Sequence, residues 1–134
     1  MSNEIIPINI NSEMDIVLAR QKGRALANSL GFSSIDGALI ATAISELTRN
    51  LITYAKSGTI ILEHIQEHGK NGILVTSIDE GPGIESIELA LQDGYSTTNS
   101  LGLGLPGVRR LMDTFNITSE FGKGTTVTAI KWAY

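Results

Sequence analysis

The pattern of apolar and polar residues predicts a strand followed by a helix at the start of the chain. Side chains alternate over residues 5–10, and Pro7, which has no N–H group, favours a place at a sheet edge. Ser12 has the side chain of a helix N-cap, and Gly31 is placed to end the helix. The apolar stripe of this helix comprises Ile16, Ala19, Gly23, Leu26, Ala27 and Leu30. Because Gly23 has no side chain, we expect another backbone to pack close to it.

A second helix is predicted from Ser33 or Ser34 to about residue 55. Its apolar stripe comprises Ile40, Ile44, Leu47 and Leu51. Glu46 and Asn50 lie four residues apart on a face about a quarter-turn from that stripe. Such a pair is most often a solvated helix flank, and the alternative is a pair of functional groups beside the core.

The remaining pattern predicts strands joined by polar turns. Residues 59–65 and 73–78 are predicted to form an antiparallel hairpin around the turn 66–72. Further along we expect a short helix over 85–91, a loop over 93–100, a helix over 108–115 with an apolar stripe that includes Phe115, and strands over 116–121 and 125–132. The predicted fold is a two-layer α/β sandwich, with helices on one face of a mixed, mainly antiparallel sheet.

Composition narrows the class of protein. A length of 134 residues with 42% hydrophobic content predicts one domain over residues 1–134. We expect neither a membrane span nor a secretory signal, because no apolar run approaches about 18 residues and no charged-then-apolar leader is present. The absence of cysteine excludes disulfides and thiolate metal sites and is compatible with a cytoplasmic protein. A net charge of −4 opposes non-specific binding to nucleic acid or to an anionic membrane.

Two glycine clusters mark the candidate site. Asp79 ends the apolar run 73–78 and is followed by Gly81 and Gly83, which leave the backbone bare enough for a flat ligand. Glycines in the segment 102–107 precede a predicted helix, where free N–H groups and the positive helix end form an anion cradle. Together they predict a nucleotide between a carboxylate that binds its base and a loop that binds its phosphates.

Other glycine-rich sites fit less well. The segment 102–107 has the spacing G-x-G-x-x-G, but a dinucleotide-binding fold requires a strand directly before it, and here the polar loop 93–100 precedes it. The chain also has no H-R-D, D-F-G or Walker A motif. His64 and His68 are predicted to be solvated, and no segment is left for the phosphoacceptor domain of a sensor histidine kinase.

The order of the motifs resembles the four ATP-binding boxes of the GHKL superfamily, which has the Bergerat ATP-binding fold. The motifs are Glu46-x-x-x-Asn50, Asp79-x-Gly81-x-Gly83, Gly102-x-Gly104-x-x-Gly107 and Gly122-x-Gly124-Thr125. The resemblance covers nearly the whole chain. Within the superfamily, segments 43–50, 104–113 and 129–132 are most similar to the bacterial stressosome switch kinases. The anti-sigma-factor serine kinases are the next most similar group.

The resemblance implies how ATP is held. Asp79 would accept a hydrogen bond from the adenine amino group, with Gly81 and Gly83 leaving room for the ring and Thr125 helping through a water. The phosphate loop would comprise Gly102, Leu103, Gly104, Leu105 and Gly107, with main-chain N–H groups of its glycines holding the phosphates.

The resemblance also implies the catalytic groups. Asn50 would ligate Mg²⁺, and Glu46 would be the general base that takes the proton from an attacking serine or threonine hydroxyl. Residues 93–102 contain no Lys or Arg, whereas anti-sigma kinases can use a lid arginine on the terminal phosphate. Arg109 or Lys123 is the candidate replacement, beside magnesium and the backbone.

The implied function is an ATP- and magnesium-dependent protein serine/threonine kinase. Its expected partners are STAS-domain substrate or scaffold proteins of the stressosome and a downstream protein phosphatase that it activates after release, in bacterial sigma-factor signalling. One alternative is an anti-sigma factor that also phosphorylates the antagonist of its sigma factor. Another is a nucleotide-gated partner-binding module with little catalysis.

Overall fold

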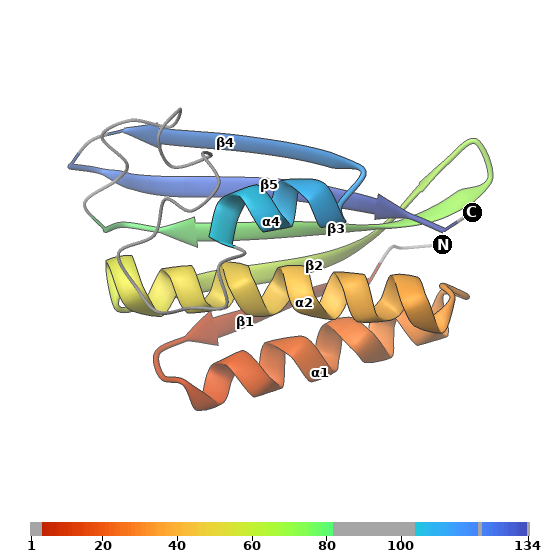
Figure 1. Ribbon diagram of the computed structural model, residues 1–134, viewed down its shortest axis with the longest axis horizontal. Coiled ribbons are helices and arrows are strands. Elements are labelled where there is room, and N and C mark those ends of the chain that lie inside the picture. Colours follow the sequence, from red (N-terminus) through yellow and green to blue (C-terminus); the bar gives the residue numbers. More distant parts are fainter. Residues whose placement is uncertain (1–3, 82–103, 121, 134) are drawn as a thin grey trace.

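The computed structural model describes residues 4–81, 104–120 and 122–133. In Figure 1 the helices form one layer over one face of a sheet, as the sequence predicted. The helices are α1 (Met14–Ser29), α2 (Ser34–Asn50) and α4 (Gly104–Leu111), and α2 continues into a π-helical segment, η1 (Leu51–Ala55). The helix expected over 85–91 and the loop expected over 93–100 lie outside the described residues.

The sheet is antiparallel throughout its described strands. Its strands, in spatial order, are β1 (Ile5–Ile10), β2 (Gly58–Glu67), β3 (Lys70–Asp79), β5 (Gly124–Trp132) and β4 (Thr114–Glu120). Every pairing among them is antiparallel, so the parallel component allowed by a mixed sheet is not found in this part of the chain. The strand that contains Pro7 lies at an edge, as predicted.

The β2–β3 hairpin is tighter than the sequence suggested. The predicted turn 66–72 was wrong, because Glu67 pairs with Lys70 and only His68 and Gly69 lie between the strands. Both turn residues have positive φ, +53° and +78°, which is the backbone of a two-residue hairpin whose twist matches its strands. The polar composition of this segment therefore reflects exposure and not a long loop.

The two histidines of this hairpin differ in environment. The side chain of His68 is 88% exposed, which confirms its predicted solvation. The predicted solvation of His64 was wrong, because this residue is half-buried and its Nε2 lies 3.0 Å from Oδ1 of Asn71. Among the described residues no group of histidine, aspartate and glutamate could hold a metal ion.

The start of α1 differs from the prediction in its capping. Its N-cap residue is Glu13, without a side-chain cap, and Ser12 does not cap the helix. Instead Oδ2 of Asp15 accepts the N–H groups of Asn11 at 2.8 Å and of Ser12 at 3.1 Å. A carboxylate in the first turn thus reaches back to the chain before the helix, at the end of the helix where a negative charge is favoured.

The boundary between α1 and α2 agrees with the sequence. Gly31 follows α1 with φ of +85°, the left-handed backbone that ends many helices. Oγ of Ser33 accepts the N–H of Asp36 at 3.1 Å, so Ser33 is the cap of α2. The helical path then runs on through η1 to Ala55, as expected.

The last helix begins earlier and ends earlier than predicted. It begins at Gly104 and ends at Leu111, and Phe115 lies in β4 instead of on a helical stripe. The N–H of Asp113 already donates to the carbonyl of Ile130 in β5 at 2.8 Å. The chain thus pairs with the sheet in a region where apolar residues three and four apart had suggested that the helix continues.

The core lies between the two layers. The predicted apolar stripe runs along α2 into the first residue of η1, and its four residues are at most 2% exposed: Ile40, Ile44, Leu47 and Leu51. A Cβ atom on Gly23 would overlap Cδ1 of Ile44. The expected close backbone at Gly23 was therefore wrong, since the space is filled by a side chain of α2.

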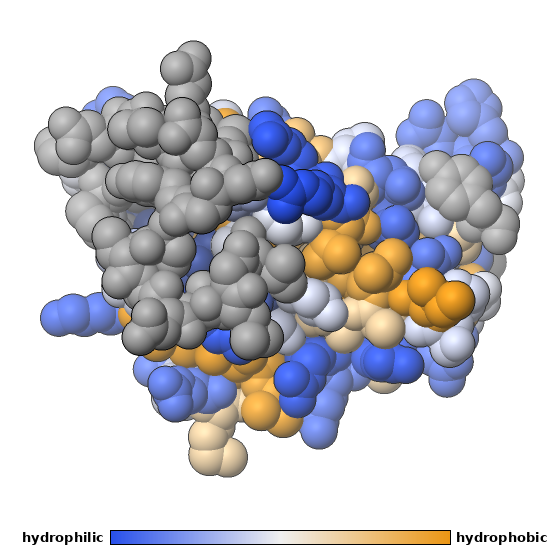
Figure 2. Space-filling model, viewed as in Figure 1, coloured by the Kyte–Doolittle hydropathy of each residue, from blue (hydrophilic) through white to orange (hydrophobic). Residues whose placement is uncertain are grey.

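Several large apolar side chains remain exposed on the helix layer. Met14, Val17 and Leu18 on the first turns of α1 are 80%, 42% and 41% exposed, and Ile35 at the start of α2 is 72% exposed. Figure 2 shows hydrophobic patches over this part of the molecule beside hydrophilic surface. Within the described residues, no helix has the length and hydropathy needed to cross a membrane.

Candidate active site

Asp79 is held at the end of β3 by its own carboxylate. Its Oδ1 accepts the N–H of Gly81 at 2.9 Å and the N–H of Thr125 at 3.3 Å. Within the part of the chain that the structure describes, Oδ2 receives no hydrogen bond. One oxygen therefore fixes the side chain, and the other can accept a donor from a ligand.

The backbone around Asp79 has no room for side chains. A Cβ on Gly81 would lie 2.7 Å from Cβ of Ala55 and 3.2 Å from Oδ1 of Asp79. Gly124 has φ of +126°, and a Cβ there would collide with the carbonyl oxygen of Asp79. Glycine at both positions thus keeps β3, β5 and the end of η1 close together and keeps the carboxylate edge open.

Glu46 joins two segments that are distant in the sequence. Its side chain is only 3% exposed, and its Oε2 accepts the N–H of Gly104 at 3.3 Å. Gly104 has φ of +51° and is the first residue of α4. The predicted general base therefore lies beside the predicted phosphate loop, which excludes a solvated helix flank for this side chain.

Asn50 ends α2 one turn after Glu46 and is half-buried. Among the described residues its side chain makes no hydrogen bond, so its amide oxygen is available to a ligand. Magnesium is commonly held by one or two protein oxygens together with phosphates and water. A single amide oxygen beside a phosphate loop fits that donor set.

The first turn of α4 supplies the predicted phosphate donors. The first four residues of a helix have no intrahelical partner for their N–H groups. Gly104 and Leu105 provide such groups here, while Pro106 in the same turn has no N–H group to leave unpaired. Gly107 is buried within the helix and is not part of a loop. Gly83, Gly102 and Leu103 lie outside the described residues.

Thr125 lies beside Asp79, but through its backbone. Its Oγ1 is 3.0 Å from Oγ of Ser119 on β4, and its N–H donates to Asp79. Thr125 thus lies beside the predicted adenine acceptor, and its water-mediated contact with adenine stays a prediction.

Comparison with known proteins agrees with this geometry. Residues 35–133 match the family described as "Histidine kinase-, DNA gyrase B-, and HSP90-like ATPase". The chain belongs to this GHKL family. The predicted superfamily and the α/β sandwich are confirmed, and a GHKL ATPase domain implies that this chain binds ATP.

Two kinds of relative resemble this GHKL chain. It is 50% identical over 125 residues to "Serine/threonine-protein kinase RsbT" of Bacillus subtilis (strain 168), covering 93% of this chain and 94% of the relative. It is 34% identical over 118 residues to "Anti-sigma F factor" of Thermoanaerobacter sp. (strain X514), covering 85% of this chain and 82% of that relative. The chain is an RsbT-like homologue of a serine/threonine kinase, as the sequence predicted.

Arg49 is a cation of the GHKL site that sequence reasoning missed. Its Nη1 donates to Oε1 of Glu46 at 2.7 Å. Its spacing of three residues from Glu46 on one helix was the available signal. By contrast, Arg109 is exposed on α4, and Lys123 forms an exposed ion pair with Glu120 at 3.2 Å. Of these three cations, only Arg49 contacts a predicted catalytic residue.

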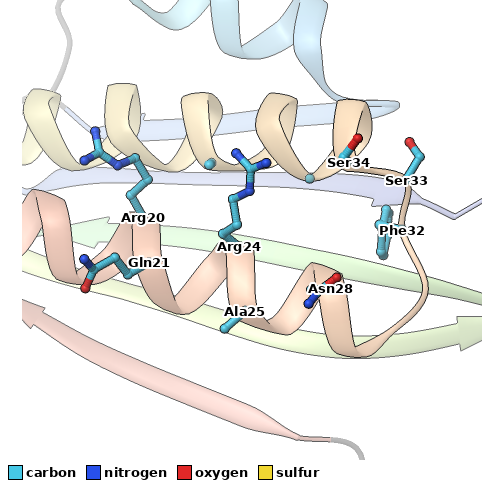
Figure 3. A pocket seen from close by; sticks show the side chains of 10 residues that line it. Arg20, Gln21, Arg24, Ala25, Asn28, Phe32, Ser33 and Ser34 are labelled. Atoms are coloured by element: carbon cyan, nitrogen blue, oxygen red, sulfur yellow. The ribbon is translucent and has the colours of Figure 1, made fainter.

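A separate groove of about 580 Å³ lies between α1 and the first half of α2. Figure 3 shows Arg20 and Arg24 extending from α1 toward α2 along this groove, with Phe32 and Ser33 at its end. None of the predicted site residues lines it. The groove thus adjoins the start of α2, whereas Glu46 and Asn50 lie near the C-terminal end of α2.

Proposed function

We propose that this chain is a cytoplasmic, magnesium- and ATP-dependent protein serine/threonine kinase. The observation that carries the proposal is the 3.3 Å contact between Oε2 of Glu46 and the N–H of Gly104. This contact supports a proton acceptor, Glu46, beside the start of α4, where phosphates can be held. Phosphoryl transfer to a hydroxyl needs the proton acceptor and the phosphates close together. The RsbT relative, with 50% sequence identity, supports the same activity.

In this proposal the nucleotide lies between Asp79 and the first turn of α4. Oδ2 of Asp79 accepts the adenine amino group, because Oδ1 is already engaged by two backbone donors. The N–H groups of Gly104, Leu105 and Gly107 donate to phosphate oxygens, an arrangement that the positive end of a helix also favours. Gly83, Gly102 and Leu103 are proposed to complete these two loops.

The last two turns of α2 carry the groups proposed for magnesium binding and proton transfer. Magnesium, when bound, neutralises charge on the phosphates, and the amide oxygen of Asn50 is the protein group proposed to hold it. Glu46 takes the proton of a serine or threonine hydroxyl as that oxygen bonds to the terminal phosphorus and the bond to ADP breaks. The low exposure of Glu46, 3%, keeps this proton acceptor shielded from bulk water.

The proposed substrate is a STAS-domain stressosome protein with an exposed hydroxyl, and a downstream protein phosphatase is the second partner. The RsbT relative supports this context, and exposed Met14, Val17 and Leu18 on α1 offer apolar surface of the kind that protein contacts use. An anti-sigma factor with serine kinase activity is a second candidate, which the 34% identical anti-sigma F factors favour.

The test is transfer of label from ATP to a STAS-domain stressosome protein of the same cell, with the modified residue mapped. We expect magnesium-dependent label on serine or threonine. Label on no residue, while calorimetry still shows ATP binding, would instead support the nucleotide-gated binding module. Capture of a sigma factor by the ATP-bound chain would favour the anti-sigma candidate.

A further inference from the structure

The carboxylate of Glu46 is held by two different partners. Oε1 accepts Nη1 of Arg49 at 2.7 Å, and Oε2 accepts the N–H of Gly104 at 3.3 Å. The Glu46 side chain is 3% exposed and that of Arg49 is 35% exposed. Because the Glu46 carboxylate is buried, the short, charge-assisted hydrogen bond from Arg49 restricts its orientation far more than an ion pair on the surface would.

The two contacts of Glu46 differ in whether a bound nucleotide can displace them. The N–H of Gly104 has no partner within α4 and donates to Glu46, so a phosphate at the start of this helix would compete with Glu46 for it. The bond from Arg49 comes from the same helix, three residues on, and does not depend on that loop. The terminal torsion of a glutamate is otherwise soft, so its carboxylate needs such a fixed donor to keep one orientation.

We propose that Arg49 is a positioning residue for Glu46. By binding Oε1 it turns Oε2 toward the first residue of α4, where the hydroxyl of the phosphoacceptor must arrive to meet the terminal phosphate. This inference rests on the proposed kinase function and on Glu46 as its proton acceptor. It assigns to Arg49 a role in the rate of transfer and none in holding ATP.

Two other roles for Arg49 predict different measurements. If Arg49 only neutralises a buried carboxylate, its loss lowers thermal stability but leaves transfer by the folded protein unchanged. If the guanidinium contacts the terminal phosphate directly, its loss weakens ATP binding and acts independently of Glu46. A positioning residue instead changes kcat alone and acts only while Glu46 is present.

The experiment compares Arg49→Gln, Arg49→Lys, Glu46→Gln and the double variant Glu46→Gln/Arg49→Gln. Arg49→Gln is expected to lower kcat by about 10–100-fold, since misplacing a catalytic group by about 1 Å costs that order of rate. The dissociation constant of ATP stays within about twofold, because the binding groups are untouched. Arg49→Lys restores part of the rate, and Arg49→Gln causes no further loss in the Glu46→Gln background.

The control is Lys22→Gln, which removes one positive charge from the exposed face of α1. It is expected to leave kcat and ATP affinity unchanged. Guanidinium ion added to Arg49→Gln should restore part of the rate without affecting Glu46→Gln. Should Arg49→Gln fail to fold, Arg49→Lys decides, with a smaller kcat loss expected at unchanged ATP affinity.

Three results overturn the inference. They are an unchanged kcat in folded Arg49→Gln, a loss that multiplies with that of Glu46→Gln, and a weakened affinity for ATP that accounts for the lost rate. In each of these the wild-type chain still transfers phosphate, so the proposed function survives. Absence of transfer by the wild-type chain to any serine or threonine overturns the proposed function and the inference together.

Discussion

The N–H of Thr125 donates to Oδ1 of Asp79 at 3.3 Å, so β5 helps to hold the carboxylate that ends β3. The N–H of Gly81 donates to the same oxygen at 2.9 Å. These two bonds orient Asp79 from both sides before any ligand arrives. A preorganised acceptor of this kind binds with less loss of side-chain freedom.

Asp79→Asn should weaken ATP binding at least about tenfold, at a cost of about 1–3 kcal/mol for an unsatisfied buried polar group. The asparagine oxygen can still accept from Gly81 and Thr125, which turns its NH₂ group toward the adenine amino group and opposes two donors. Calorimetry measures the affinity, and Asp36→Asn at the start of α2 is the matched control. Full affinity in a folded Asp79→Asn protein would contradict the assignment of the adenine acceptor.

Glu46→Gln and Asn50→Ala should separate catalysis from metal binding. Glu46→Gln keeps an acceptor for Arg49 but cannot take a proton, so phosphoryl transfer should fall about 10²–10⁴-fold with ATP and magnesium binding retained. Asn50→Ala should remove the magnesium-dependent part of ATP affinity. Titrations with and without magnesium, beside single-turnover transfer, distinguish the two. Wild-type activity in Glu46→Gln would place the proton acceptor elsewhere.

Gly124→Ala should destabilise the fold much more than Gly122→Ala. Both glycines have positive φ, +126° and +84°, so each substitution costs backbone strain of about 1–3 kcal/mol. Only at Gly124 would the new Cβ also collide with the carbonyl of Asp79, whereas Gly122 has nothing within 4 Å. Urea unfolding of the two variants measures the difference. Equal losses would show that β3 and β5 separate at little cost.

Gly23→Ala should destabilise the protein by about 1–3 kcal/mol, the usual cost of overpacking a core. Its Cβ would occupy the place of Cδ1 of Ile44, which is fully buried. Ile44→Val removes that methyl group, so the double variant should be more stable than the sum of the two single changes predicts. Strict additivity in thermal unfolding would mean that α1 moves away instead.

The sequence by itself determined the family, the order of the helices and strands in the described part of the chain, and the apolar stripe that packs against the sheet from the second helix. The apolar stripe of α2 and the spacing of Glu46 from Asn50 are local patterns, and a helix converts such spacing directly into a shared face. The motif around Asp79 likewise needed only its neighbours in the chain. The prediction of one domain over residues 1–134 stays a prediction, since part of the chain lies outside the described residues.

Only the tertiary structure decided which of these local groups meet. Glu46 and Gly104 are 58 residues apart, and Asp79 and Thr125 are 46 residues apart. Spacing along the chain does not report such distances, because they depend on how α2 and α4 pack and on which strands pair. The same cause ended α4 at Leu111, where pairing with β5 prevailed over a helical pattern. The burial of Glu46 to 3% exposure was decided there as well, whereas its ion pair with Arg49 lies within one helix at a spacing that the sequence already shows.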